Sequence, residues 1–135
     1  IASVTGSMSF DTFNDCNPRK PTPVLQIHGS IDAVVPYDGL LSIMKPVMEV
    51  MDYWKTANDC DEFVHTVPEI IAGESSWTEI YLFENCLNDT QNIHLKVQGA
   101  GHIWPGSKFE SIKDPDTSNQ IWEFFSRYDI NGVIQ

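Results

Sequence analysis

Apolar residues gather in four segments that predict β-strands. The clearest segment is 92–98, where Ile93, Leu95 and Val97 share one side of the predicted strand and polar residues occupy the other. The other three are mostly apolar or aromatic runs that predict buried strands: residues 1–6, 23–28 and 77–83.

Two further segments show the helical period. In the first, which Pro46 would start, apolar residues are spaced i, i+3, i+4 and i+7: Val47, Val50, Met51 and Trp54. The second begins near Thr117, where Gln120 three residues later makes a capping-box pattern ahead of an apolar face at 121–128. Residues 61–76 predict a loop. Strands that alternate with helices predict an α/β fold.

Length and charge narrow the class of protein. The chain has 135 residues, of which 41% are hydrophobic and 20% charged, a composition typical of one globular domain. The net charge of −11 repels polyanions and therefore excludes nucleic acid and anionic lipid as main partners. No apolar run approaches the roughly 18 residues of a membrane-spanning helix, so no membrane partner is expected.

The cysteines leave two structures open. Cys16, Cys60 and Cys86 show no spacing typical of metal ligands, so we expect no metal ion. Cys60 and Cys86 each lie at the edge of a predicted element, which suits a disulfide. Two buried thiols fit the same positions equally well.

Two titratable residues directly follow predicted strands. Asp32 comes after the strand at 23–28, and His102 comes after the strand at 92–98, flanked by glycines that allow a sharp turn. Ligands of open α/β sheets bind at the carboxyl ends of the strands. An acid followed later in the chain by a histidine matches the last two members of an α/β-hydrolase triad.

The remaining histidines and one tryptophan receive other interpretations. His28 lies within the end of its strand, which favours a structural hydrogen-bonding role under the loop. His65 and His94 are expected to be solvated surface residues. Trp104 fits a core position or the wall of a substrate pocket, and its place two residues after His102 favours the wall.

Four segments resemble those of polyhydroxybutyrate depolymerase-like esterases, α/β-hydrolases that include feruloyl and acetylxylan esterases. Residues 28–39, HGSIDAVVPYDG, resemble that family's IHGTADxxVPYxG segment, and residues 101–106, GHIWPG, resemble its GHTWPG segment. Residues 121–125, IWEFF, and the stretch from Tyr53-Trp54 to Cys60 resemble two further segments of the family. The HGxxD pattern alone is weak, whereas four segments in the same order are fairly specific.

The resemblance implies a secreted serine esterase that uses no cofactor. Asp32 would be the acid that orients the imidazole of His102, and His102 would be the general base. The implied fold is the C-terminal part of an α/β-hydrolase sheet with flanking helices. The implied substrates are esters of polyhydroxyalkanoates or of feruloyl- or acetyl-polysaccharides. A disulfide between Cys60 and Cys86 would fit an extracellular or periplasmic location.

The nucleophile is not expected within this chain. Its family position is the serine of a GxSxG turn, and the sequence contains no such motif. Ser7 and Ser9 lie close to Gly6 but lack the flanking glycines. We therefore expect residues 1–135 to be the C-terminal portion of a single catalytic domain, inactive without the N-terminal half.

A non-catalytic function is the alternative. A module that binds carbohydrate or protein would use exposed aromatic residues such as Trp77 and Trp104 on a flat face. Most aromatic residues here fall instead at the spacing of a helical core, which disfavours this interpretation.

Overall fold

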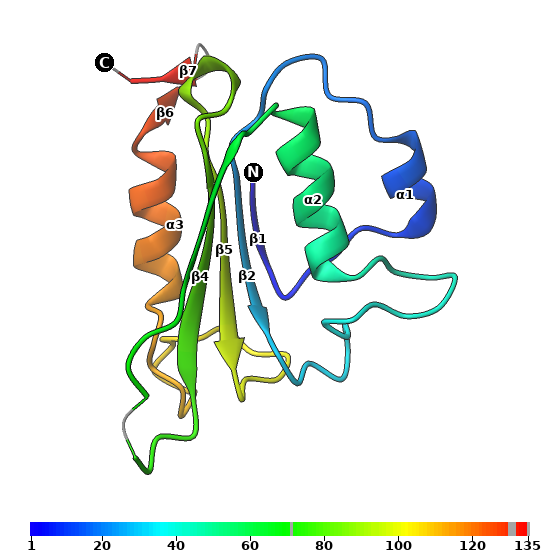
Figure 1. Ribbon diagram of the computed structural model, residues 1–135. Coiled ribbons are helices and arrows are strands. Elements are labelled where there is room, and N and C mark those ends of the chain that lie inside the picture. The colour runs from blue at the N-terminus through cyan, green and yellow to red at the C-terminus, as the bar shows by residue number, and fades with distance from the viewer. Residues whose placement is uncertain (71, 130–131, 135) are drawn as a thin grey trace.

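A computed structural model describes residues 1–70, 72–129 and 132–134 and contains a mixed five-stranded sheet (Figure 1). In spatial order the strands are β1 (Ala2–Val4), β2 (Val24–Gly29), β5 (Asn92–Gln98), β4 (Trp77–Glu84) and β3 (Glu62–Thr66). The helices are α1 (Phe10–Asp15), α2 (Val47–Ala57), the 3-10 helix η1 (Leu87–Asp89) and α3 (Thr117–Phe125). Two short strands, β6 (Tyr128–Asp129) and β7 (Gly132–Val133), form a separate ribbon.

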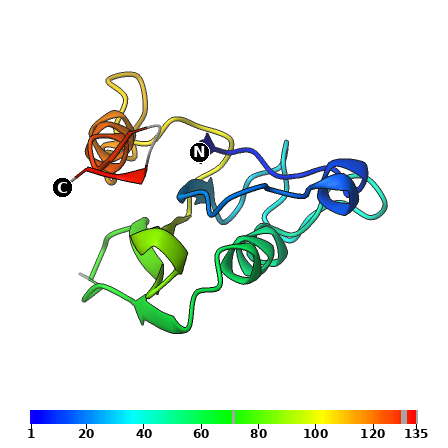
Figure 2. The same cartoon turned by 90° about the horizontal axis from the view of Figure 1, so that it is seen from above.

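The sheet is parallel on one side and antiparallel on the other. β1, β2 and β5 run parallel, with Leu25 of β2 opposite Ala2 of β1 and Ile93 of β5. β4 runs antiparallel to β5, and β3 runs antiparallel to β4. Helices α2 and α3 cover opposite faces of the sheet (Figures 1 and 2). This layered arrangement agrees with the predicted α/β class.

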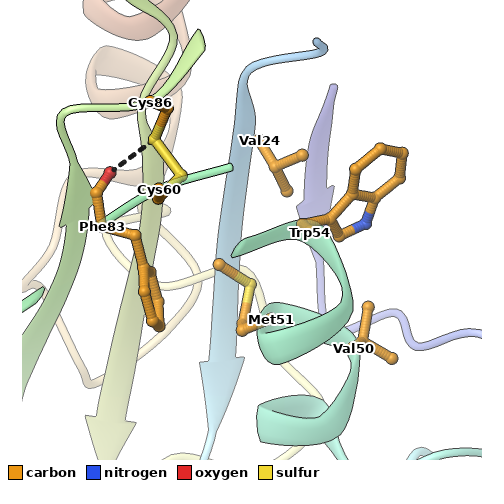
Figure 3. Close-up of a cluster of buried hydrophobic side chains, with 7 residues drawn as sticks. All are labelled: Val24, Val50, Met51, Trp54, Cys60, Phe83 and Cys86. Carbon is orange, nitrogen blue, oxygen red and sulfur yellow. Dashed lines mark hydrogen bonds between the residues drawn. A yellow bond between two sulfur atoms is a disulfide. The ribbon is translucent and has the colours of Figure 1, made fainter. Parts of the chain in front are cut away.

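The face under α2 holds one hydrophobic core and the disulfide. The four residues at helical spacing in α2 are all buried, as predicted. Figure 3 shows this core, whose members are Val24, Val50, Met51, Trp54, Cys60, Phe83 and Cys86. Cys60 and Cys86 are disulfide-bonded and tie the chain after α2 to the end of β4. The disulfide alternative is therefore confirmed, and Cys16 remains a free thiol.

The opposite face packs against α3. Its core consists of Leu25, Ile27, Leu95, Val97, Ala100 and Phe124. The helix is capped by Asp116, whose carboxylate accepts the N–H of Asn119 at 3.1 Å. The sequence had suggested Thr117 as the cap, one residue later. Aspartate accepts that hydrogen bond as well as threonine does, so the local pattern fits both positions.

Residues 62–66 form β3, which corrects the predicted loop at 61–76. All five residues of this edge strand are exposed, so they show no buried-face periodicity that would reveal a strand. The strand exists because it pairs with β4, from Glu62 opposite Glu84 to Thr66 opposite Ile80. Such pairing is a long-range interaction that local sequence does not display.

His94 is completely buried, which contradicts its predicted place on the surface. Its Nδ1–H donates to the carbonyl of Gln26 at 3.1 Å, and its Nε2 accepts the hydroxyl of Tyr37 at 2.8 Å. The ring also stacks on Tyr37 and Tyr81. Burial lowers the pKa of His94 to about 3, so the imidazole is neutral at ordinary pH. His65, by contrast, lies on exposed β3 as expected.

In the described ranges, no helix has the length and apolar character required to span a bilayer.

Candidate active site

Two loops meet at the carboxyl ends of β2 and β5, and hydrogen bonds join them. The N–H groups of Ser30 and Ile31 donate to the carbonyls of Val97 and Ala100, each at 3.0 Å. In return, the N–H of Gly99 donates to Oγ of Ser30 at 3.0 Å. These bonds hold the two predicted site loops in a defined relation.

Gly29 allows the two loops to come this close. A Cβ atom at this position would lie 2.2 Å from the carbonyl oxygen of Ala100 and 2.5 Å from that of Gly101. Both are backbone atoms, which cannot move aside as the end of a flexible side chain can. Glycine is therefore required here by close approach of two backbones.

Asp32 and His102 lie in direct contact although 70 residues separate them in sequence. Oδ2 of Asp32 is 2.9 Å from Nδ1 of His102. An ionised carboxylate only accepts hydrogen bonds, so Nδ1 carries the proton and Nε2 is left able to accept one. The carboxylate is fully buried, whereas 41% of the histidine side chain is exposed. The imidazole can therefore meet a reactant, and the acid cannot.

The turn after Asp32 stabilises the ionised carboxylate. Oδ1 accepts the N–H of Val34 at 2.8 Å and that of Val35 at 2.9 Å. Burial raises the pKa of Asp32, but hydrogen bonds from Val35, His102 and Val34 outweigh burial and hold the pKa below its usual range. The group is therefore charged at neutral pH.

His28 lies fully buried beneath this turn. Its Nε2 is 2.8 Å from the carbonyl oxygen of Val35 and 3.5 Å from Oδ2 of Asp32. Its Nδ1 is 3.1 Å from the side-chain nitrogen of Gln26. These contacts agree with the structural, hydrogen-bonding role predicted for His28.

Trp104 lies at the surface and in neither core. The residue is 44% exposed, and its indole N–H donates to Oγ of Ser118 at 3.2 Å. A core role is therefore excluded, and a role as the wall of a substrate pocket stays a prediction.

Sequence patterns did not reveal the backbone N–H groups that bind Asp32 or the side chain that contacts His28. The N–H groups of Val34 and Val35 carry no side-chain signature, and the contribution of Gln26 depends on which strand face it occupies. Gly29 was the one available signal, as a glycine directly after a buried strand. Within the residues that the structure describes, no group of three or more His, Cys, Asp or Glu side chains is placed to hold a metal ion.

Two known proteins with related sequences are both named as esterases. A bifunctional acetylxylan esterase/xylanase of Neocallimastix patriciarum is 24% identical over 134 residues, which cover 99% of this chain and 18% of that protein. NocK of Nocardia uniformis subsp. tsuyamanensis, named as a candidate esterase, is 28% identical over 128 residues, covering 81% of this chain and 36% of that protein. The chain thus spans about a fifth and about a third of the lengths of these relatives. No protein-family model matches the chain.

Proposed function

We propose that this chain supplies the acid and the base of a Ser-Asp-His triad in a secreted carboxylic ester hydrolase. The observation that carries the proposal is the contact of Asp32 Oδ2 with His102 Nδ1 at 2.9 Å, between two loops at the carboxyl edge of the sheet. The similarity to two proteins named as esterases supports the same reaction class.

Each residue has a defined role in this reaction. Asp32 holds the imidazole with the proton on Nδ1 and stabilises the imidazolium that forms. Nε2 of His102 takes the hydroxyl proton as a serine attacks the ester carbonyl carbon, and then gives it to the departing alcohol oxygen. A water molecule, deprotonated by the same nitrogen, hydrolyses the acyl-enzyme and restores the serine.

The serine and the oxyanion hole are proposed to come from chain that precedes residue 1. The sequence contains no GxSxG motif, and both relatives are much longer than this chain. In the described part of the chain, β1 is an outermost strand of the sheet and pairs with β2 alone. A preceding strand on the free side of β1 would continue an α/β-hydrolase sheet, of which this chain is the C-terminal portion.

The substrate is proposed to be an ester of a polyhydroxyalkanoate or of a feruloyl- or acetyl-bearing polysaccharide. The exposed ring of Trp104 offers a flat apolar wall two residues from the general base. The disulfide between Cys60 and Cys86 supports an extracellular or periplasmic location, because stable disulfides are rare in the cytosol.

Labelling with a fluorophosphonate tests where the nucleophile lies. The reagent forms a covalent bond with an activated serine, and peptide mass spectrometry of the full-length protein locates it. We expect one labelled serine, outside residues 1–135, and we expect His102→Ala to abolish the labelling. A labelled serine within residues 1–135 would contradict the proposed division of the triad, and labelling that persists in His102→Ala would contradict the role of His102.

A further inference from the structure

Two buried polar side chains of β2 lie beneath the Asp32 turn and take no part in the proposed proton transfer. Gln26 and His28 are two residues apart in the strand, so they share one face of the sheet. Gln26 is 5% exposed, and His28 is not exposed at all. Buried polar groups need hydrogen-bond partners, and these two find theirs in the site loop and in the chain after β1.

The hydrogen bonds allow His28 one tautomer. The carbonyl of Val35 can only accept, so Nε2 of His28 carries a proton and donates it across 2.8 Å. Nδ1 then accepts an N–H from the amide of Gln26 at 3.1 Å. The same amide nitrogen donates its second N–H to the carbonyl of Gly6 at 2.9 Å. Every donor in this row has an acceptor, and the imidazole is neutral.

This series of hydrogen-bonded side chains ends at the carboxylate of Asp32, which contacts His102. Nε2 of His28 lies 3.5 Å from Oδ2 of Asp32, the oxygen that accepts from His102. The carbonyl of Val35 accepts a hydrogen bond from His28, and the N–H of Val35 donates to Oδ1 of Asp32. The turn from 32 to 35 is thus closed by Asp32 and held from below by His28.

We propose that Gln26 and His28 are positioning residues that hold Asp32 in the orientation in which it accepts the Nδ1 proton of His102. Gln26 holds the ring of His28 by donating to its Nδ1, His28 donates to the carbonyl of Val35, and the turn from 32 to 35 orients the carboxylate of Asp32. A neutral His28 also leaves the charge of Asp32 to His102, whereas an imidazolium at the same place would compete for it. The inference rests on the proposed roles of Asp32 and His102.

Imidazole NMR of the full-length protein, labelled with ¹⁵N-histidine, tests the inference without reference to ester turnover. The nitrogen shifts report the tautomer of each ring, and a low-field proton on Nδ1 of His102 reports its hydrogen bond to Asp32. We expect a neutral His28 protonated on Nε2 and a resolved low-field signal from His102. A His28 protonated on Nδ1 would overturn the proposal.

Three variants separate positioning from general packing. His28→Leu removes the donor, and we expect the low-field signal of His102 to be lost through faster exchange. His28→Gln offers an N–H on a side chain of similar reach and should recover the signal. Gln26→Leu keeps His28 but removes the donor to its Nδ1, while the Val35 carbonyl still requires the proton on Nε2. The Nε2–H tautomer should therefore persist, and the His102 signal should weaken because the His28 ring is held less firmly. Circular dichroism confirms that each variant is folded, and Gln26→Leu carries the test if His28→Leu is not.

Asn92→Leu is the matched control, because it removes another fully buried polar side chain from the adjacent strand β5, opposite Val24 at the other end of β2, where it bonds Asn58. We expect this variant to keep the low-field signal of His102. Equal loss in Asn92→Leu and His28→Leu would overturn the proposal, as would an unchanged signal in His28→Leu. If the esterase proposal also holds, His28→Leu lowers kcat roughly 10- to 100-fold with little change in KM. An absence of turnover in the wild-type protein would count against the esterase alone, because the NMR result does not depend on it.

Discussion

Asp32 sits between two imidazoles that differ in what they can reach. Both His28 and His102 approach the same carboxylate oxygen, at 3.5 Å and 2.9 Å. His28 is sealed in the interior, whereas 41% of the His102 side chain is exposed. One carboxylate therefore serves a structural partner and a chemical partner at once, and only the chemical partner can contact a substrate.

Substitution of the acid and the base should reduce ester turnover by different routes. His102→Ala removes the proton acceptor, so we expect a loss of several orders of magnitude, down to a residual of about 10³ over water. Asp32→Asn favours the wrong imidazole tautomer and should cost on the order of 10⁴ in kcat. The measurement is hydrolysis of a short-chain nitrophenyl ester by the full-length protein. His65→Ala, on the exposed edge strand, serves as the control. Folded Asp32→Asn or His102→Ala enzyme with near-parental turnover would refute these roles.

Gly29→Ala should separate the two site loops. The added Cβ meets backbone oxygens at 2.2 and 2.5 Å, so the chain must shift. We expect the free energy of unfolding to fall by about 1–3 kcal/mol, measured by urea denaturation. Gly101→Ala is the matched control, because a Cβ at Gly101 meets nothing within 4 Å. Equal stability of the two variants would show that close approach at Gly29 is unimportant.

At the scale of elements, β5 contributes to the core under α3, to a buried polar face and to the candidate site. α3 packs over its Leu95 and Val97 side, and on the other side His94 lies between two tyrosine rings. Its carboxyl end then leads directly to His102. The central strand thus carries a buried histidine whose neutral form is favoured in the folded protein.

The burial of neutral His94 predicts a loss of stability on mild acidification. In the unfolded chain His94 takes up a proton near its usual pKa of about 6.5, whereas in the folded chain its pKa is about 3. The free energy of unfolding therefore falls as pH drops through this window, by about 2 kcal/mol between pH 7 and pH 5. Urea titrations at both pH values measure the change.

His94→Gln should lose most of this pH dependence, because the variant has no group to titrate there. His65→Gln, which replaces the exposed histidine of β3, should keep it. If His94→Gln and the parent lose the same stability between pH 7 and pH 5, then the burial of neutral His94 does not cause the effect.

At the scale of the whole molecule, the β1 edge of the sheet, the opposite edge at β3, and one surface of α3 lack partners within the described residues. β1 pairs only with β2. On α3, Trp122 is 72% exposed and Phe125 is 47% exposed. β1 therefore offers an unpaired strand edge, and α3 offers an exposed aromatic surface.

We therefore expect residues 1–135 alone to self-associate or to bind another part of the protein. An unpaired strand edge and exposed aromatic side chains both favour association. Sedimentation velocity over a range of concentrations measures the state of the isolated chain, and Trp122→Glu should weaken the association. A monomer that unfolds in one cooperative transition would contradict the expectation.

The sequence by itself determined the elements whose signals are local. The helical spacing in α2, the alternation in β5 and the apolar run of β2 each follow from how a strand or helix presents its own side chains. Asp32 and His102 could be selected for the same reason, since each follows such a strand.

Only the tertiary structure decided what those elements meet. Asp32 and His102 are brought within 2.9 Å by the parallel pairing of β2 and β5, which no local pattern encodes. His94 is polar and alternates with apolar residues, so the local pattern predicts a solvent-exposed position. In the folded chain that face of β5 is covered, and Tyr37 supplies a hydrogen-bond partner. β3 likewise exists only because β4 offers it backbone hydrogen bonds. Burial and pairing are properties of the neighbours a residue acquires on folding, and those neighbours come from distant parts of the chain.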